Sequence, residues 1–567
     1  MTMPVPTDER ILKVLNSNAT PSPPDGTFEL ALVLGGTVSA GAYTAGFLDK
    51  LIEALDAWYV AKTNGEDVPG HDVKLRVASG ASGGGVCAAI LARALAFGFP
   101  HISPASSEIE WARNPFYKTW VQDLDIAGFV ETDDLGAGQP LKSLLNGKAI
   151  SRVTKAAAAF RGGPLPEDWT ERPYVDNPFR VIVTLANLTG VPYEVNFGQF
   201  GKQSYRFHAD HARFACDIGT GGGVPTSLRP DEFFVQEGGQ EPAVNWLTLA
   251  CYARASGAFP LGFPAVGLRR PRAHYDYRVA VVPDDSGQVS VVPLRPDWTG
   301  SDVGDEYTFL SVDGGTFNNE PIELARTFMA GVTGRNPRDR AEANRGVMLI
   351  DPLPGTAQLG PDRFESMVKL GGAVLSSLVN QGRYATTDLL LMADPDVFSR
   401  YLAIPQRSNI SGEKALATAG LSAFLGFFED EYRRHDYMLG RANCHTYLAK
   451  ELKLSEANPI FVRRWTKTQK QDFGQDAGDG FLPLIPLVGP ARQPDGTMPW
   501  PRGKLTARQI RDRLKDRLER IVGKVADDAI DFPLSDLLIW ALKGAAASEL
   551  LDPIEEMAKV DLRDWRL

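Results

Sequence analysis

One serine stands in a setting that suits a nucleophile. Residues 80–84 read Gly-Ala-Ser-Gly-Gly, which places Ser82 between Gly80 and Gly84 in a G-x-S-x-G pattern. The apolar stretch Val73–Ala78 before it predicts a strand, and a helical pattern begins directly after it. Glycines suit this kind of strand-to-helix turn because its backbone is strained and larger side chains would clash. The pattern predicts a nucleophile at Ser82; the alternative is a structural glycine turn.

A serine nucleophile needs a base. None of the seven histidines directly follows a predicted strand, so we interpret them as surface or packed residues. An aspartate is better placed, because the predicted strand Tyr307–Val312 ends at Asp313, which Gly314 and Gly315 follow. A carboxylate enclosed in an apolar site has a raised pKa and can accept a proton. Asp351, which follows another predicted strand, is a rival base. For Asp313, the structural alternative is a plain Asp-Gly turn.

A glycine-containing turn follows the first predicted strand. Residues 34–41 read Leu-Gly-Gly-Thr-Val-Ser-Ala-Gly, and such a turn exposes backbone N–H groups. Gly36 and Gly41 have the spacing of a phosphate-binding loop, but Ala42 and Tyr43 stand where that loop needs lysine and serine or threonine. A nucleotide site is therefore disfavoured, and an oxyanion hole is the better use of these N–H groups.

These residues must be positioned by strands that alternate with helices. The sequence predicts strands at 30–34, 73–78, 179–185, 307–312 and 346–350, and helices at 42–58 and 86–97. Such alternation predicts an α/β fold with a largely parallel sheet, in which sites lie at the carboxyl ends of strands. We expect a surface hairpin within 278–305, and from about residue 360 a mainly helical region with no further clear strand.

Taken in order, these motifs resemble those of the patatin-like phospholipases. Residues 254–264 (RASGAFPLGFP) are similar to the family's A-S-x-A-x-P-x-x-F-P block. Residues 313–321 (DGGTFNNEP) resemble its D-G-G-x-x-x-N-N-P, with Glu320 as an extra residue before the proline. Residues 184–190 are similar to its T-x-L-x-T-G strand end. The resemblance covers roughly 28–355.

The resemblance implies a three-layer α/β sandwich and a serine acyl hydrolase of phospholipase A type that acts on lipid or phospholipid esters. Ser82 would be the nucleophile and Asp313 the base of a dyad that works through an acyl-enzyme, with no cofactor and no metal. The implied oxyanion hole draws on N–H groups of Gly35, Gly36, Thr37, Val38, Gly41 and Gly83. Two alternatives stay open: a thioesterase or neutral-ester hydrolase, and a non-catalytic lipid-binding or scaffold protein on the same fold.

The chain departs from the family in its glycine-rich turn. The family pattern is G-G-G-x-[RK]-G-A-Y, and here Ala40 replaces the arginine or lysine, with one more residue between the glycines. The replacement removes a positive charge near the site, which favours a neutral ester or a thioester over an anionic phospholipid. The backbone donors, which supply most oxyanion stabilisation, remain.

We expect a lead-in at 1–27, a catalytic domain at 28–355 and a mainly helical region at 356–567. In residues 435–444 (HDYMLGRANC) we expect packing against the core, with Gly440 in a tight turn and Arg441 paired with a carboxylate.

Sixty basic and 70 acidic residues give a net charge of −10, which disfavours nucleic acid as a partner. Residues 502–524 instead hold nine Lys/Arg and three Asp/Glu, on an amphipathic helical pattern. One interpretation is peripheral contact with an anionic membrane; the other, which we favour, is packing against the acidic tail.

Four dispersed cysteines fit a reducing compartment. We find no secretory signal and no apolar run of about 18 residues, the length a membrane-spanning helix needs. The sequence therefore predicts a cytoplasmic protein, and it does not indicate an oligomeric state.

Overall fold

The computed structural model describes most of the chain. The described residues are 6–19, 22–136, 138–197, 199, 201–219, 223–239, 242–283, 285–286, 289–355, 377, 381–383, 385–527 and 547–567.

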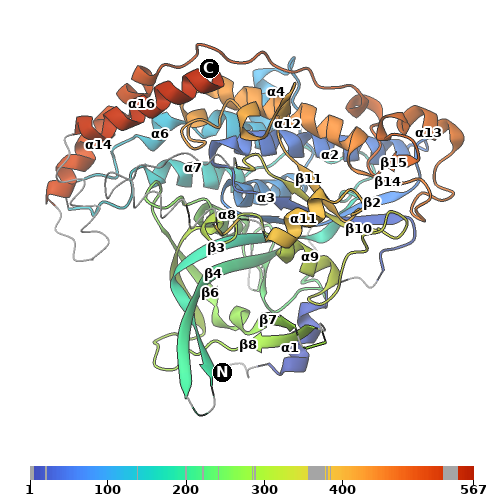
Figure 1. The fold of residues 1–567 in the computed structure, drawn as a ribbon, viewed down its shortest axis with the longest axis horizontal. Helices are drawn as coiled ribbons and strands as arrows, with labels where there is room; N and C mark the ends of the chain where they lie inside the picture. The colour runs from blue at the N-terminus through green and yellow to red at the C-terminus, as the bar shows by residue number, and fades with distance from the viewer. Residues whose placement is uncertain are drawn as a thin grey trace.

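In the described part of the chain, a nine-stranded sheet forms the centre of the molecule (Figure 1). Its main path runs β11-β10-β1-β2-β3-β4-β5, and β9 joins β3 and β6. Pairing is parallel from β11 to β3 and antiparallel where β3 meets β4 and β9. The strands are β1 (Thr27–Leu34), β2 (Asp72–Gly80), β3 (Val175–Asn196), β4 (Lys202–Cys216), β5 (Glu232–Val235), β6 (Val266–Pro271), β9 (Glu306–Asp313), β10 (Arg345–Ile350) and β11 (Arg400–Ala403). The expected α/β fold with a mostly parallel sheet is confirmed.

Helices cover both faces of this sheet, because its strands are apolar on both sides. Leu30, Leu32 and Leu34 of β1 face one core, and Ala31 and Val33 face a second one. The helices on the first side include α2 (Gly41–Thr63), α3 (Gly83–Ala94), α7 (Gly147–Ala158) and α8 (Trp246–Ser256), whereas α9 (Ile322–Ala330) packs on the second. The result is three layers.

The region after residue 360 differs from its expectation in one respect. The expectation of no further strand was wrong, because β11 pairs in parallel with β10 and extends the central sheet. A four-residue strand is too short to leave a periodic pattern in the sequence. The expected surface hairpin is present as β7 (Arg278–Pro283) paired with β8 (Val289–Leu294).

Helix α12 (Asp430–Lys450) lies along α2 as a second helical tier (Figure 1). Gly440 sits inside this helix, so its expected place in a tight turn was wrong. A Cβ atom at Gly440 would lie 2.1 Å from the carbonyl oxygen of Tyr43, and one at Gly46 would lie 1.9 Å from that of Tyr437. The two glycines therefore let the helices approach closely.

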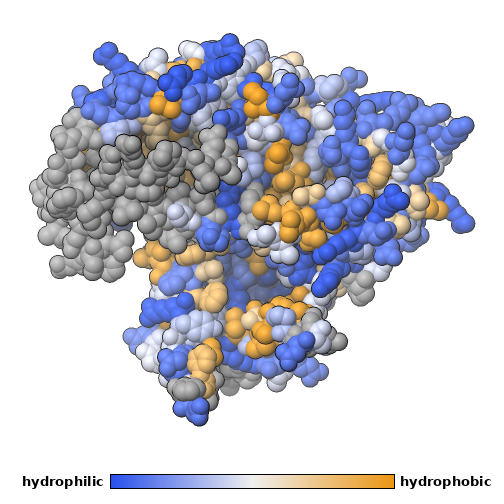
Figure 2. Space-filling view, viewed as in Figure 1, coloured by the Kyte–Doolittle hydropathy of each residue, from blue (hydrophilic) through white to orange (hydrophobic). Residues whose placement is uncertain are grey.

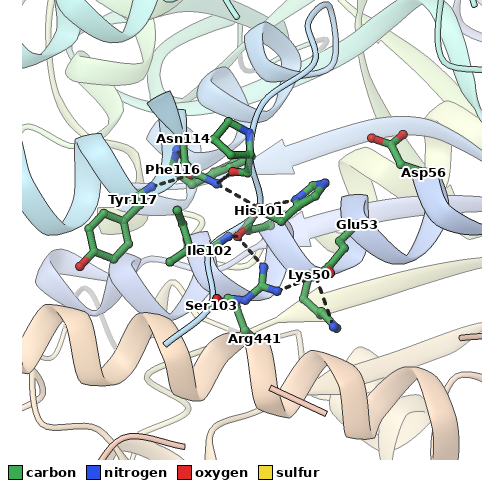
Figure 3. Close-up of polar contacts among 12 residues, drawn as sticks. Lys50, Glu53, Asp56, His101, Ile102, Ser103, Asn114, Phe116, Tyr117 and Arg441 are labelled. Atoms are coloured by element: carbon green, nitrogen blue, oxygen red, sulfur yellow. Dashed lines mark hydrogen bonds and ion pairs between the residues drawn. The ribbon is translucent and has the colours of Figure 1, made fainter. Parts of the chain in front are cut away.

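Buried charges also join these two helices. Arg441 points from α12 towards α2, where it pairs with Asp49 at 2.5 Å and with Glu53 at 2.5 Å (Figure 3). It also pairs with Asp495 at 2.9 Å, and Lys50 lies 3.2 Å from Glu53. The expectation that Arg441 pairs with a carboxylate is confirmed.

The basic segment 502–524 forms most of α14 (Ala507–Asp527), which packs against α16 (Ala547–Trp565). Ile521 is buried together with Leu551, and Arg511 pairs with Glu555 of α16 at 2.9 Å. The apolar side of this helix is therefore inside the protein, as the packed-helix interpretation predicts. Its exposed residues include Arg508, Asp512, Lys515, Glu519 and Arg520. The described surface at the upper left of Figure 2 is mostly hydrophilic. Among the described residues, no helix is long and apolar enough to cross a bilayer.

Candidate active site

Ser82 occupies the sharp turn between β2 and α3. Its φ of 52° and ψ of −131° lie outside the regions that side-chain-bearing residues prefer. A Cβ atom at Gly80 would lie 2.5 Å from the carbonyl oxygen of Gly84, and one at Gly84 would lie 2.1 Å from that of Leu34. The two glycines are thus required by close contact within the turn and with β1. The turn presents Ser82 at the carboxyl end of the sheet.

The sheet brings Asp313 to this serine across 231 positions of sequence. Strand β3 lies beside β2 and, at Leu185, pairs with the last residue of β9, which is Asp313. The Ser82 hydroxyl donates a hydrogen bond of 2.6 Å to Oδ2 of Asp313. The Gly315 N–H donates one of 2.8 Å to Oδ1, which holds the carboxylate in place.

Asp313 is 5% exposed, and burial raises its pKa to about 7. The hydrogen bonds from Ser82 and Gly315 oppose this rise in pKa without cancelling it. Within the described part of the chain, we find no ion pair to Asp313. An aspartate with this pKa can exchange a proton near neutral pH.

The rival base, Asp351, belongs to a different group of charges. It follows β10 and lies 3.3 Å from Arg383, which also pairs with Glu320 at 3.0 Å. Burial, and then the charge of Glu320, raise the pKa of Asp351 to about 7. Sequence reasoning noticed Glu320 only as an extra residue in a motif and missed this cluster, because Arg383 lies in a stretch without a recognisable pattern.

Histidines take structural positions. Buried His71 packs against Trp465, and His211 lies against Arg278. Among the described residues, we find no histidine in hydrogen-bond contact with Ser82 or Asp313.

The glycine-rich turn lies beside Ser82. Two of its N–H groups are engaged elsewhere: Gly35 donates to the carbonyl of Ile350 at 3.1 Å, and Gly41 donates to carbonyls of the preceding turn. The other four candidate donors are the N–H groups of Gly36, Thr37 and Val38 in this turn and of Gly83 next to Ser82. For these four N–H groups we find no acceptor among the described residues. The candidate oxyanion donors are thereby reduced from six residues to four.

Ser82 and Asp313 line a cavity of about 70 Å³ whose other walls are mainly apolar. Helices α3 and α7 and the short helix Lys118–Asp123 contribute to it. Sequence reasoning missed Trp120, Phe424 and Phe427, because no motif links them to the serine. The apolar lining residues are Val38, Val86, Trp120, Leu124, Phe129, Ile150, Val153, Ala157, Phe259, Phe263, Phe424 and Phe427.

Ser256 supports the turn from the side. Its hydroxyl accepts a hydrogen bond of 2.9 Å from the Ser82 N–H. It comes from the end of α8, within the 254–264 block that the sequence analysis singled out. In the described ranges, no cluster of three or more His, Cys, Asp or Glu side chains could hold a metal ion.

Comparison with known proteins matches the part of the chain that contains Ser82 and Asp313. The family model described as patatin-like phospholipase matches residues 32–326, just over half of the chain. Uncharacterized protein y4iI of Sinorhizobium fredii is 32% identical over 519 residues, which cover 84% of this chain and 72% of that protein. The crystal structure of VipD from Legionella pneumophila aligns with 96% of this chain and 88% of its own, at 13% identity and a TM-score of 0.19, too low to carry an argument. The chain belongs to the patatin-like phospholipase family.

Proposed function

We propose that the protein is a serine acyl hydrolase of phospholipase A type, which cleaves fatty-acyl esters of lipids through Ser82 and Asp313. The observation that carries this proposal is the 2.6 Å hydrogen bond from the Ser82 hydroxyl to the carboxylate of Asp313. That carboxylate is buried, and its hydrogen-bond donors are uncharged. Family membership supports the lipid class of the substrate.

In the first half-reaction, Asp313 accepts the proton of Ser82 as the serine oxygen attacks the ester carbonyl carbon. The free N–H groups of Gly36, Thr37, Val38 and Gly83 are the candidate donors to the oxyanion that forms. The C–O bond to the alcohol then breaks, and Asp313 returns its proton to the leaving alkoxide. An acyl-enzyme on Ser82 and a free alcohol or lysolipid result.

In the second half-reaction, Asp313 takes a proton from water, and the hydroxide oxygen attacks the acyl carbon. Collapse of this intermediate releases the fatty acid and returns the proton to Ser82. Gly314 lets the chain after Asp313 pass close to β3, because a Cβ atom at this position would lie 2.2 Å from the carbonyl oxygen of Thr184. The apolar cavity suits the acyl chain rather than a polar acyl donor.

The cavity also bears on where the catalytic unit ends. Phe424 and Phe427 line it, although both follow the expected boundary at residue 355. We propose that the region 356–567 is part of the working enzyme.

Because the apolar side of α14 is internal, any membrane contact through 502–524 is electrostatic, through exposed side chains such as Arg520.

Covalent labelling with a fluorophosphonate probe tests the nucleophile. We expect wild type to label and Ser82→Ala not to label, with both proteins showing the same circular dichroism spectrum. Ser311→Ala is the matched control, because Ser311 is a buried serine on β9 whose hydroxyl bonds to the Val312 carbonyl rather than to Asp313. It should label like wild type. Absence of labelling in wild type, or equal labelling of Ser82→Ala, contradicts the proposal and favours a non-catalytic lipid-binding role.

A lipid panel assayed on wild type and Ser82→Ala separates the remaining alternatives. Phospholipid, diacylglycerol and acyl-thioester substrates with the same acyl chain distinguish a phospholipase from a neutral-ester hydrolase or a thioesterase. We expect activity on both oxygen esters and dependence of each on Ser82.

A further inference from the structure

A groove of about 770 Å³ lies next to the active-site cavity, between α7 and the segment that precedes it. We call it the α7 groove. Arg254 of α8 lines both the α7 groove and the cavity that contains Ser82. The groove is lined by Asp133, Asp134, Gln139, Pro140, Lys142, Ser143, Gly147, Lys148, Ser151, Arg152, Lys155, Arg254, Pro264 and Ala265.

Positive charge exceeds negative charge along this lining. It holds five Lys or Arg side chains and two carboxylates. The carboxylates are already neutralised, since Asp133 pairs with Lys148 at 2.9 Å and Asp134 pairs with Arg517 at 2.7 Å.

Of the remaining cations, Arg152 pairs with Glu131 at 2.9 Å, just outside the lining. Among the described residues, we find no carboxylate paired with Lys142, Lys155 or Arg254. Within the described structure, the α7 groove therefore offers three cations for which we find no anionic partner.

Among the described residues, Arg254 makes few hydrogen bonds and we find no ion pair to it. Its guanidinium donates to the Ser151 hydroxyl, but its Nε atom is buried and has no hydrogen-bond acceptor within the described residues. Since that Nε atom is closed to solvent, a ligand would meet the terminal N–H groups of the guanidinium, whose charge-assisted hydrogen bonds suit a phosphate oxygen. Helix α7 also begins at Gly147 in the groove, with the positive end of its dipole.

We infer that the α7 groove binds the phosphate group of a glycerophospholipid whose acyl ester lies at Ser82. This inference rests on the proposed function. Arg254, shared by both spaces, would contact the phosphate nearest the ester, and Lys142 and Lys155 would attract it from the rim. The groove thus supplies the positive charge that Ala40 does not supply in the glycine-rich turn.

The first test removes rim charge with the double variant Lys142→Gln/Lys155→Gln. The measured quantity is the ratio of kcat/KM for dioctanoyl phosphatidylglycerol to kcat/KM for dioctanoylglycerol, both in the same neutral detergent micelles. Because each exposed charge contributes modestly, we expect this ratio to fall about fivefold to tenfold. The matched control is Lys450→Gln/Lys467→Gln, which removes two exposed lysines of the C-terminal helices and should keep the wild-type ratio. An unchanged ratio in the groove variant, or an equal fall in the control, overturns the inference.

The second test distinguishes a lipid phosphate from free phosphate. Titration calorimetry on Ser82→Ala compares dioctanoyl phosphatidylglycerol below its micelle concentration, dioctanoylglycerol and inorganic phosphate. We expect the phospholipid to bind most tightly and to lose affinity in the triple variant that also carries both lysine replacements. If inorganic phosphate binds as tightly as the phospholipid, the groove is a free-phosphate site and the inference fails.

The two proposals can fail separately. Hydrolysis that persists in Ser82→Ala contradicts the proposed function, whatever the substrate ratio. Hydrolysis that depends on Ser82 while phospholipid binding ignores both lysines contradicts only the assignment of the α7 groove.

Discussion

Asp49 and Asp313 are both buried aspartates, but their surroundings are opposite. Asp49, at the interface of α2 and α12, lies 2.5 Å from the guanidinium of Arg441 and accepts further hydrogen bonds from Tyr437 and Asn114. Asp313, at the carboxyl edge of the sheet, accepts hydrogen bonds only from uncharged donors, the Ser82 hydroxyl and the Gly315 N–H, among the described residues.

The two surroundings move the pKa in opposite directions. Burial alone would raise the pKa of Asp49, but the charge of Arg441 and the hydrogen bond from His101 outweigh it and hold that pKa well below its usual range. At Asp313, burial dominates and raises the pKa to about 7. A buried aspartate with a cation anchors two helices, whereas one without a cation is suited to proton transfer.

The largest expected effect is a loss of ester hydrolysis when Asp313 is replaced. Asp313→Asn should lower kcat/KM for ester hydrolysis by about 10⁴-fold, since a positioned base contributes up to that factor and the described site offers no second one at Ser82. The folded state should persist, because the amide replaces a carboxylate that has no ion pair. Ester assays together with thermal denaturation measure both quantities.

Asp351→Asn is the matched control for that loss, because Asp351 is also buried and its pKa is also raised to about 7. Its kcat/KM should stay within a few-fold of wild type. Substantial activity in Asp313→Asn, lost in Asp351→Asn, would transfer the role of base to Asp351.

The next effect concerns stability at the other aspartate. Arg441→Met should lower the free energy of unfolding by about 3–5 kcal/mol, because it leaves a buried carboxylate without its cation. Denaturant titration measures the loss, and activity per folded molecule should be retained. The double variant Asp49→Asn/Arg441→Met should recover part of the stability. If Arg441→Met is as stable as wild type, the ion-pair account of this interface is wrong.

The smallest effect is the dependence on pH. Because the base must be ionised, kcat/KM should rise about tenfold per pH unit up to about pH 7 and then level off. The free energy of unfolding should change with pH in the opposite direction. The folded-state pKa of Asp313 lies above its unfolded value, so its contribution is present below about pH 4 and is lost as the pH rises towards 7.

Rate profiles and unfolding titrations at several pH values check both signs. Asp351 titrates in the same direction, so Asp313→Asn should remove only part of the pH dependence of stability. Asp49 should contribute nothing in this window. A rate that is flat from pH 5 to pH 8 would contradict a base with the pKa of Asp313.

The sequence anticipated elements that carry a strong local signal. The turn at Ser82, the strand that ends at Asp313 and the core strands of the sheet were all read from apolar runs and glycines. It failed where the signal is non-local. Strand β11 pairs with the edge of β10, and a glycine stands inside helix α12 at position 440 because a Cβ atom there would clash with the Tyr43 carbonyl.

The candidate site shows the same division. Residue types and spacing indicated which side chains could react and disfavoured a nucleotide-binding loop, because turn chemistry depends on neighbours in sequence. Only the tertiary structure decided that Asp313, and not Asp351, touches Ser82, that Gly35 and Gly41 use their N–H groups elsewhere, and that Phe424 and Phe427 line the cavity. These features depend on burial and on charges contributed by distant segments, and both arise only when the sheet and its helices are assembled.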